Sequence, residues 1–345
     1  MSRPARVAAV MAAVLVAAAV MSAATGALGI PLGKAFAILF LEPLGIGSVT
    51  STEYERAVVI GVRAPRIVLG VLVGSALGSC GAAVQGLFKN PLADPGLVGV
   101  SAGASLGAAV AIVLGGGALA AMPEWMRPAL LPLAAFVGGC VVTAAVLRLG
   151  SGLRGVAATM TVLLAGVAMN ALAGAMVGML SYLADDVQLR RLVFWTMGDI
   201  EYARWVDVAC TAPWIILVLV GLPRLGRTLD LLSLGEREAS YLGVRVARVR
   251  VLVVGAVALG VGATVAVAGL IGFLGLVVPH LVRLLVGSHN RLVIPISGLA
   301  GATLLVVADL LSHLLFTTAR PVGLFTVALG APFFLYLLRK QTRLV

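Results

Sequence analysis

The sequence predicts an all-α membrane protein of about ten transmembrane helices, folded as one domain over residues 1–345. Of the 345 residues, 61% are hydrophobic and only 11% are charged, whereas about 25% of the residues of a soluble domain are charged. Apolar stretches of the roughly 20 residues that a helix needs to cross a bilayer recur along the whole chain. The links between these stretches are short, so we expect no separate soluble domain.

The first predicted span covers residues 7–30 and follows two arginines. Nine more spans are predicted over residues 63–87, 97–118, 128–149, 156–183, 205–223, 245–268, 271–287, 292–314 and 322–338. The first span also has features of a secretory signal peptide, because a small-residue SAA run follows its apolar core. We favour a transmembrane helix, because the apolar stretch is long and many spans follow it.

The net charge of +11 would suggest a nucleic-acid partner in a soluble protein. With the N-terminus in the cytoplasm, however, 16 of the 25 basic residues fall on the inner side of the predicted spans and 9 on the outer side. The outer segments also carry most of the acidic residues. The positive-inside rule therefore predicts that both termini are cytoplasmic, and this topology accounts for the charge without nucleic acid.

Small residues four apart predict close helix packing, because lipid-embedded helices associate by van der Waals contact between their backbones. Three such ridges occur: Gly70, Gly74 and Gly78; Gly99, Gly103 and Gly107; and Gly166, Gly174 and Gly178 with Asn170 on the same stripe. We interpret these ridges as static packing surfaces in preference to gating elements.

The segment between the second and third predicted spans contains a short motif with two prolines around an acidic residue. It consists of Asn90, Pro91, Leu92, Ala93, Asp94 and Pro95. Because proline lacks a backbone donor and disfavours helix in the residue before it, the chain must break and turn here.

This motif, NPLADP followed by GVSAGA, resembles the permease family of bacterial ATP-binding cassette (ABC) importers for iron-siderophores, haem and cobalamin. Further similar segments are RAPR at 63–66, SLGEREASYLGV at 233–244, GFLGLVVPHLVRLLVG at 272–287 and PVGLFTVALGAPFFLYLL at 321–338. The sequence departs from the family at Leu270, where proline is common, and near Arg320, where an acidic residue is usual. The resemblance implies a type II ABC importer permease in the bacterial cytoplasmic membrane.

The cytoplasmic segment 224–244 contains a short predicted helix. Ser233 is a candidate N-cap with Glu236 three residues later, the capping-box pairing, and Gly243 is a suitable terminator. Alone, the segment reads as an ordinary amphipathic connector. The resemblance implies instead that it is the coupling helix, which fits a cleft in an ATPase subunit. The predicted coupling residues are Ser233, Leu234, Gly235, Glu236, Ala239, Leu242 and Gly243.

On the outer side, residues 187–199 predict a short helix on the membrane surface, because the LVFWTM run has an apolar face with Trp195 suited to an interface. Among the outer basic residues, Arg63, Arg66 and Arg320 go against the positive-inside trend and need a reason to be there. They could simply snorkel to the interface. The resemblance implies that Arg63 and Arg66 receive surface glutamates of a periplasmic binding protein, and Arg320 is added because it precedes the last span.

Polar residues inside the predicted spans are few. Asp309 and His313 share a helix face one turn apart, and a hydrogen bond to a neighbouring helix is the favoured role for the carboxylate over a functional one. The resemblance implies that the fifth and tenth spans line a pathway between two copies of the chain. The residues predicted to line it are Met169, Asn170, Gly174 and Phe325.

The sequence predicts no catalytic site, metal site or cofactor in this chain. It contains no GxxxxGK[ST] loop for ATP phosphates and no HExxH pair, and its three cysteines lie far apart in apolar stretches. The predicted partners are a second copy of the chain, two ATPase subunits that bind ATP and magnesium, and a periplasmic binding protein. Haem is the favoured cargo, followed by ferric siderophores and cobalamin. An ion-coupled secondary transporter is the alternative from another class, although it should contain more intramembrane ionisable residues.

Overall fold

The computed structural model describes residues 2–26, 28–44, 51–117, 122–124, 126–150, 156–316 and 321–341. Within these residues the chain consists of helices and contains no strand. In the described part of the chain, seven helices are long and apolar enough to cross a membrane, and α5, α13 and the first part of α15 are shorter apolar helices at three further predicted spans. The prediction of an all-α membrane protein with about ten spans is therefore confirmed.

The N-terminal third departs most from the prediction. The first span, α1 (Arg3–Ala24), ends before the predicted residue 30. It is followed by α2 (Leu32–Phe36), a π-helical turn (Ala37–Leu41) and a 3-10 turn (Glu42–Leu44). Helix α3 (Glu53–Val58) then continues through the π-helical turn η3 (Val59–Arg63) into α4 (Ala64–Phe88). The second helix thus begins ten residues earlier than predicted, at a capping box of Thr52 and Glu55.

The middle of the chain follows the predicted order. After the 3-10 turn η4 (Pro95–Val98) come α5 (Val100–Leu114), the turn η5 (Arg127–Ala129), α7 (Leu130–Leu149) and α8 (Val156–Leu183). Next are α9 (Asp186–Thr196) and α10 (Trp205–Ser233). Helix α10 runs ten residues past the predicted end, because Leu229 and Leu232 in this extension are buried in the core.

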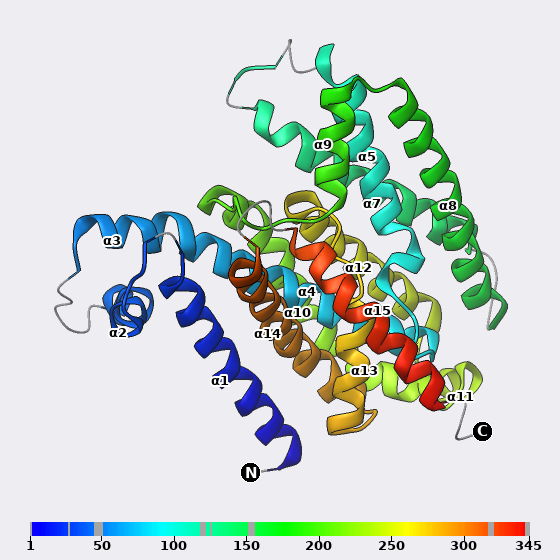
Figure 1. Ribbon diagram of the computed structural model, residues 1–345. Coiled ribbons are helices and arrows are strands. Elements are labelled where there is room, and N and C mark those ends of the chain that lie inside the picture. The colour runs from blue at the N-terminus through cyan, green and yellow to red at the C-terminus, as the bar shows by residue number, and fades with distance from the viewer. Residues whose placement is uncertain are drawn as a thin grey trace.

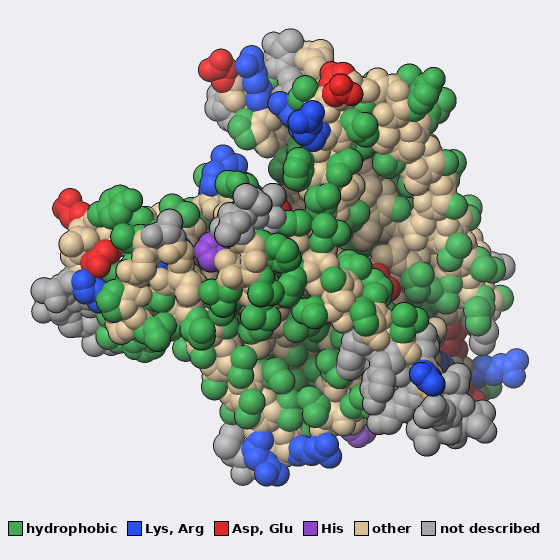
Figure 2. Space-filling model, in the orientation of Figure 1, with side chains coloured by type: hydrophobic (Ala, Val, Ile, Leu, Met, Phe, Trp, Pro, Cys, Tyr) green, Lys and Arg blue, Asp and Glu red, His purple; other side chains and the backbone are tan. Residues whose placement is uncertain are grey.

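The last third forms α11 (Glu236–Tyr241), α12 (Val246–Ala268), α13 (Leu274–Val286), α14 (Asn290–Leu315) and α15 (Val322–Gln341). Figure 1 shows both termini and α11 at the lower end of the bundle, with α9 at the upper end. On the face drawn in Figure 2, Lys and Arg side chains gather at the lower end, hydrophobic side chains cover the middle, and both charge signs occur above.

Helix α4 is the centre of the packed core. It lies against α10, α12, α13 and α14, and most of its residues are buried. A Cβ atom at Gly74 or Gly78 would overlap the backbone of α14 at Gly301 or Ser297. The α4 and α14 backbones therefore touch along this ridge, as small residues permit in membrane helices.

The predicted ridge on α8 behaves differently along its length. A Cβ at Gly166 would overlap the backbone of Leu97, but Gly174 and Gly178 have no atom within 4 Å of such a Cβ. Among the described residues, therefore, the half of the α8 ridge that the predicted topology makes the outer one packs against nothing within a single chain, and a static packing surface stays a prediction there.

Candidate coupling and docking sites

The short helix α11 lies between two long spans and is closed by glycine at both ends. Its N-cap is Gly235, at φ +138°, a backbone conformation that other residues rarely adopt. At its C-terminus Gly243 has φ +85°, and the amide of Val244 donates to the carbonyl of Ala239 at 3.0 Å. This is the Schellman ending that the terminator at Gly243 predicted.

The predicted capping box at Ser233 is wrong. Ser233 is the last residue of α10, so its backbone is helical and it cannot adopt the extended N-cap conformation. Its hydroxyl donates to the carbonyl of Asp230 at 2.6 Å instead. Gly235 is the N-cap instead, because the chain enters α11 through a residue at positive φ, which glycine adopts without strain.

The outward face of α11 carries charged residues and Tyr241, and an exposed leucine flanks the helix on each side. Leu234 and Leu242 are exposed, Tyr241 is 88% exposed, and Ala239 on the opposite side is completely buried. Large exposed apolar side chains next to charged Arg237 and Glu238 are typical of a protein contact surface. The helix thus packs on the bundle through Ala239, and the side chains of Leu234, Tyr241 and Leu242 point away from the bundle.

Glu236 points inward, away from this surface, into a three-residue cluster that we call the inner polar junction: Thr159 on α8, Glu236 on α11 and Arg250 on α12. The Thr159 hydroxyl donates to Glu236 Oε1 at 2.8 Å, and Arg250 Nη2 donates to the Thr159 hydroxyl at 2.9 Å. Arg250 Nη2 also lies 3.4 Å from Glu236 Oε1. The sequence pattern placed Glu236 in the predicted coupling helix but did not join it to Thr159 and Arg250, which lie 77 and 14 positions away along the chain.

The NPLADP motif forms the compact turn that its two prolines predict. Lys89 ends α4 in the left-handed conformation, at φ 52°. Asn90 Oδ1 accepts from the amide of Leu92 at 2.9 Å, and Asp94 Oδ1 accepts from the amide of Gly96 at 2.7 Å. Pro91 is exposed, whereas Ala93 and Pro95 are buried. Burial raises the pKa of the Asp94 carboxyl, and the hydrogen bond from Gly96 opposes that change.

This turn forms one wall of a cavity of about 420 Å³ between α4, α8 and α12. Its lining includes Asp94, Leu97 and Asn170, one of the predicted pathway residues. Asn170 Nδ2 donates to the carbonyl of Gly96 at 3.1 Å, while its Oδ1 is buried without a hydrogen-bond partner in the described part of the chain. Asn170 thus ties α8 to the motif turn.

The other predicted pathway residues are scattered around α8 and α15. Met169 and Phe325 are half-buried and pack against the main core, and Gly174 faces open space. The structure therefore does not gather Met169, Asn170, Gly174 and Phe325 around one cavity of a single chain.

At the end of the core that the predicted topology makes the outer one, Arg66 and Asp309 form a buried ion pair between α4 and α14. Arg66 Nη2 lies 2.7 Å from Asp309 Oδ1, Nε lies 2.9 Å from Oδ2, and Arg66 is 8% exposed. Arg66 Nη1 lies 3.2 Å from His313 Nδ1. The favoured structural role of Asp309, a bond to a neighbouring helix, is confirmed, and its partner is an arginine that was expected to face a binding protein.

Arg63 is also engaged within the chain. Its two terminal nitrogens donate to the carbonyls of Ala23 and Leu28, at and just beyond the end of α1. Arg320 lies outside the described residues. In the isolated chain, then, Arg63 and Arg66 bind internal acceptors, and a partner carboxylate would have to join or displace those acceptors.

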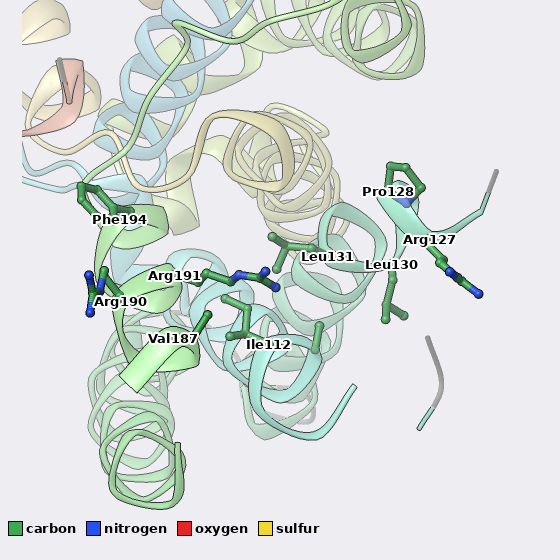
Figure 3. Close-up of a pocket in the computed structure, with 10 residues that line it drawn as sticks. Ile112, Arg127, Pro128, Leu130, Leu131, Val187, Arg190, Arg191 and Phe194 are labelled. Atoms are coloured by element: carbon green, nitrogen blue, oxygen red, sulfur yellow. The ribbon is translucent and has the colours of Figure 1, made fainter. Parts of the chain in front are cut away.

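The helix predicted at residues 187–199 is present as α9, which begins at a capping box of Asp185 and Gln188, and its position on the membrane surface stays a prediction. With α5 and α7 it encloses a cavity of about 750 Å³ lined by apolar residues and Arg127, Arg190 and Arg191. Figure 3 shows Arg191 pointing from α9 toward Ile112 and Leu131, whereas Arg190 points away from them. Both are exposed and form no ion pair with another described residue.

Below α9, the link to α10 approaches the outer ion pair. Asp199 accepts from the amide of Glu201 at 2.8 Å, and burial raises the pKa of the Asp199 carboxyl. The charge of Arg66 is near enough to oppose this rise. The outer end of the core therefore carries the carboxylates of Asp199 and Asp309 near the buried Arg66 guanidinium.

Comparisons with known proteins agree with this arrangement. The model of the FecCD transport family matches residues 14–340. The chain is 40% identical to the hemin transport system permease protein HmuU of Yersinia pestis, over 82% of this chain and 83% of that protein. It is 39% identical to the vitamin B12 import system permease protein BtuC of Vibrio vulnificus, over 87% of each.

A solved structure is similar over nearly the whole chain. It is an inward-facing conformation of a transporter assigned to the metal-chelate type of ABC transporter, with a TM-score of 0.82 and 29% sequence identity. The match covers 97% of this chain and 99% of that chain.

Proposed function

The chain belongs to the FecCD transport family, and from this premise we propose that it is the permease subunit that carries haem across the bacterial cytoplasmic membrane. Its fold is that of a type II ABC importer permease, and it is a multi-pass membrane protein. In this proposal two copies form the transport unit, two ATPase subunits bind ATP and magnesium, and a periplasmic binding protein delivers the cargo. The two copies open alternately to the outside and the inside.

The single observation that carries the proposal is the geometry of α11. The six-residue helix, closed by glycines, exposes Tyr241, and Leu234 before it and Leu242 after it are exposed as well. Exposed apolar side chains beside the inner ends of α10 and α12 support docking of an ATPase subunit, since such patches mark contact surfaces. Both termini lie at the same end as α11 in Figure 1, which supports their placement in the cytoplasm.

The second copy is supported by the exposure of α8. Leu164, Met179 and Tyr182 are among its most exposed side chains. Lipid would cover such residues equally well, but Gly174 and Gly178 on the same helix offer a smooth surface of the kind that membrane helices use to associate. With the family resemblance, this favours α8 as the helix that faces the partner copy and lines the pathway.

Docking of the binding protein is proposed at the outer end. Arg63, Arg66 and Arg320 remain the residues that the family resemblance predicts. Arg190 and Arg191 on α9 add exposed charges. Unlike Arg63 and Arg66, they do not have to break an ion pair or hydrogen bond within the described part of the chain before they bind a partner carboxylate. Exposed arginines of this kind steer an acidic partner and orient it.

The cargo proposal rests on relatives of both kinds. The haem and the vitamin B12 permeases named above are similar to this chain by nearly equal identity, so overall identity does not choose between these cargoes. Haem stays first because the residues in and around the NPLADP motif resemble those of haem permeases, with ferric siderophores second and cobalamin third. An ion-coupled transporter is disfavoured, because Asp309 is held by Arg66 and so is less available to carry protons.

The test is uptake into liposomes that contain the chain with its ATPase subunits and its binding protein. We expect haem to accumulate only with internal ATP and only with binding protein outside. Uptake of cobalamin or a ferric siderophore in place of haem would correct the cargo and keep the permease. Uptake driven by a proton gradient without ATP would overturn the proposed function.

A further inference from the structure

We infer that the inner polar junction transmits the motion of α11 to α8, so that Thr159 and Arg250 are positioning residues for the opening of the inner end of the pathway. This inference rests on the proposed function, in which an ATPase subunit pushes on α11. It adds a specific route by which that push reaches the helix facing the second copy.

The three residues of the junction come from the inner ends of three different helices. Glu236 is the first residue of α11, Thr159 lies in the first turn of α8, and Arg250 follows the first turn of α12. Glu236 is therefore placed where any displacement of α11 must move its carboxylate. Thr159 is placed where a pull acts on the end of α8 and can tilt the whole helix.

Burial makes this contact a strong one. The side chains of Arg250 and Glu236 are 8% and 15% exposed. Charges removed from water are screened little by salt, and separating them would leave an unpaired buried charge. The carboxylate and guanidinium should therefore stay together when α11 moves, and the Thr159 hydroxyl, bonded to both, should move with them.

No other hydrogen bond joins α11 to α8 among the described residues. Helix α11 otherwise contacts α10 and α12, its neighbours in the chain. Helix α8 itself packs on α5, α7 and η4 and leaves most of its surface uncovered. Its buried residues Ala158, Val162 and Ala165 lie in the half that contains Thr159, and the half that contains Gly174 and Gly178 is mostly uncovered. A force at Thr159 therefore acts on the packed half of α8 and can swing the other half with it.

The junction also has an unused donor. Arg250 Nε is buried without a hydrogen-bond partner in the described structure, and Nη2 lies a long 3.4 Å from Glu236 Oε1. A carboxylate and a guanidinium prefer two parallel bonds. A short movement of α11 toward α12 would let Glu236 accept from Nε as well, which gives the junction a second arrangement to adopt when the ATPase subunits close.

The experiment measures haem taken up per ATP hydrolysed in liposomes carrying the full complex. Thr159→Val removes the hydroxyl while keeping the shape, Thr159→Ser restores it, and Thr161→Val on the same helix is the matched control. We expect Thr159→Val to keep assembly and ATP hydrolysis but to lower uptake per ATP by about five-fold or more. Thr159→Ser and Thr161→Val should stay close to the original chain.

Glu236→Gln keeps the size of the side chain and supplies a second test that does not depend on Thr159. It should lower the same ratio, because a neutral amide no longer holds Arg250. An unchanged ratio in both Thr159→Val and Glu236→Gln would overturn the inference while the permease function stands. Failure of the unaltered chain to bind ATPase subunits would overturn the proposed function and this inference with it.

Discussion

Helices α4 and α8 are both long and apolar, but their surroundings are opposite. In the most apolar stretch of the span that contains α4, 83% of the residues are buried. In the most apolar stretch of the span that contains α8, only 17% of the residues are buried. Figure 1 shows α4 in the middle of the bundle and α8 at its edge. A helix that is apolar on all sides needs either a protein or a lipid neighbour on every side. We infer from this difference that α4 and the helices around it form a rigid core, whereas α8 can bind a partner and can move.

Polar contacts reinforce this difference. Helix α4 is tied to α14 by Arg66 and Asp309 at the outer end. At the inner end, Gln85 donates to the Leu276 carbonyl, and Arg283 bonds to Gln85 and Asn290. Helix α8 has its main interhelical hydrogen bonds at Thr159 and Asn170. The core is pinned at both ends, whereas α8 is held near one end and the middle.

The largest expected effect is at the outer ion pair of the core. Asp309→Asn leaves the Arg66 guanidinium buried without its counter-charge, which should lower the free energy of unfolding by about 3–5 kcal/mol. The matched control is Asp207→Asn, which breaks the exposed pair with Arg204 and should lower it by about 0.2–1 kcal/mol. Denaturant unfolding in detergent measures both. Equal effects would mean that the outer ion pair does not hold α4 to α14.

A second contrast sets one glycine of the core against one of α8. Gly78→Leu pushes a side chain into the α14 backbone and should destabilise the chain by about 1–3 kcal/mol or more. Gly174→Leu meets open space in a single chain and should leave its stability unchanged. Thermal unfolding of the separated chain compares the two. If Gly174→Leu leaves the stability of the single chain unchanged but weakens the association of two copies, the proposed position of α8 at their interface is supported.

A smaller effect is expected on docking. Reversal of charge at Arg190 and Arg191 on α9 should weaken binding of the binding protein about tenfold at low salt, equivalent to about 1.4 kcal/mol. The loss should shrink as salt is added, because exposed charges are screened. The measurement is the affinity of the binding protein for the immobilised transporter complex, determined from binding kinetics at low and at high salt. An affinity that does not change at low salt would remove α9 from the docking surface.

The smallest effect is expected at Ser233. Since its hydroxyl bonds to Asp230 within α10 and does not cap α11, Ser233→Ala should change the free energy of unfolding by less than about 0.5 kcal/mol. Uptake per ATP should also be unchanged. A loss near 1 kcal/mol, typical of a removed N-cap, would restore the capping box that the structure contradicts.

The sequence predicted the parts of the fold that depend on local pattern. The order of the spans, the turn at Asn90–Pro95 and the terminator at Gly243 all follow from apolar length, proline and glycine. The helix before α4 was missed although Thr52 and Glu55 form a capping box. That signal was present, but the polar residues after it interrupted the apolar stretch used to locate spans.

The candidate sites were predicted less well, because their partners are distant in sequence. Arg66 and Asp309 were each singled out, yet their pairing across 243 positions depends on how α4 packs on α14. Arg250 counted only as one more inner basic residue, and Thr159 carried no signal at all. Tertiary packing decides which faces of two helices meet. The pattern of a single sequence does not reveal these pairings.

The central claim is that α8 moves while the α4 core stays fixed, and paired spin labels test it most directly. In a chain with its three cysteines replaced by alanine, one label pair joins Leu311→Cys on α14 to Trp214→Cys on α10. The other pair joins Leu311→Cys to Tyr182→Cys on α8, with only one copy labelled in each complex. When ATP is added, the first distance should stay constant and the second should change. A change in both distances, or in neither, would contradict the account.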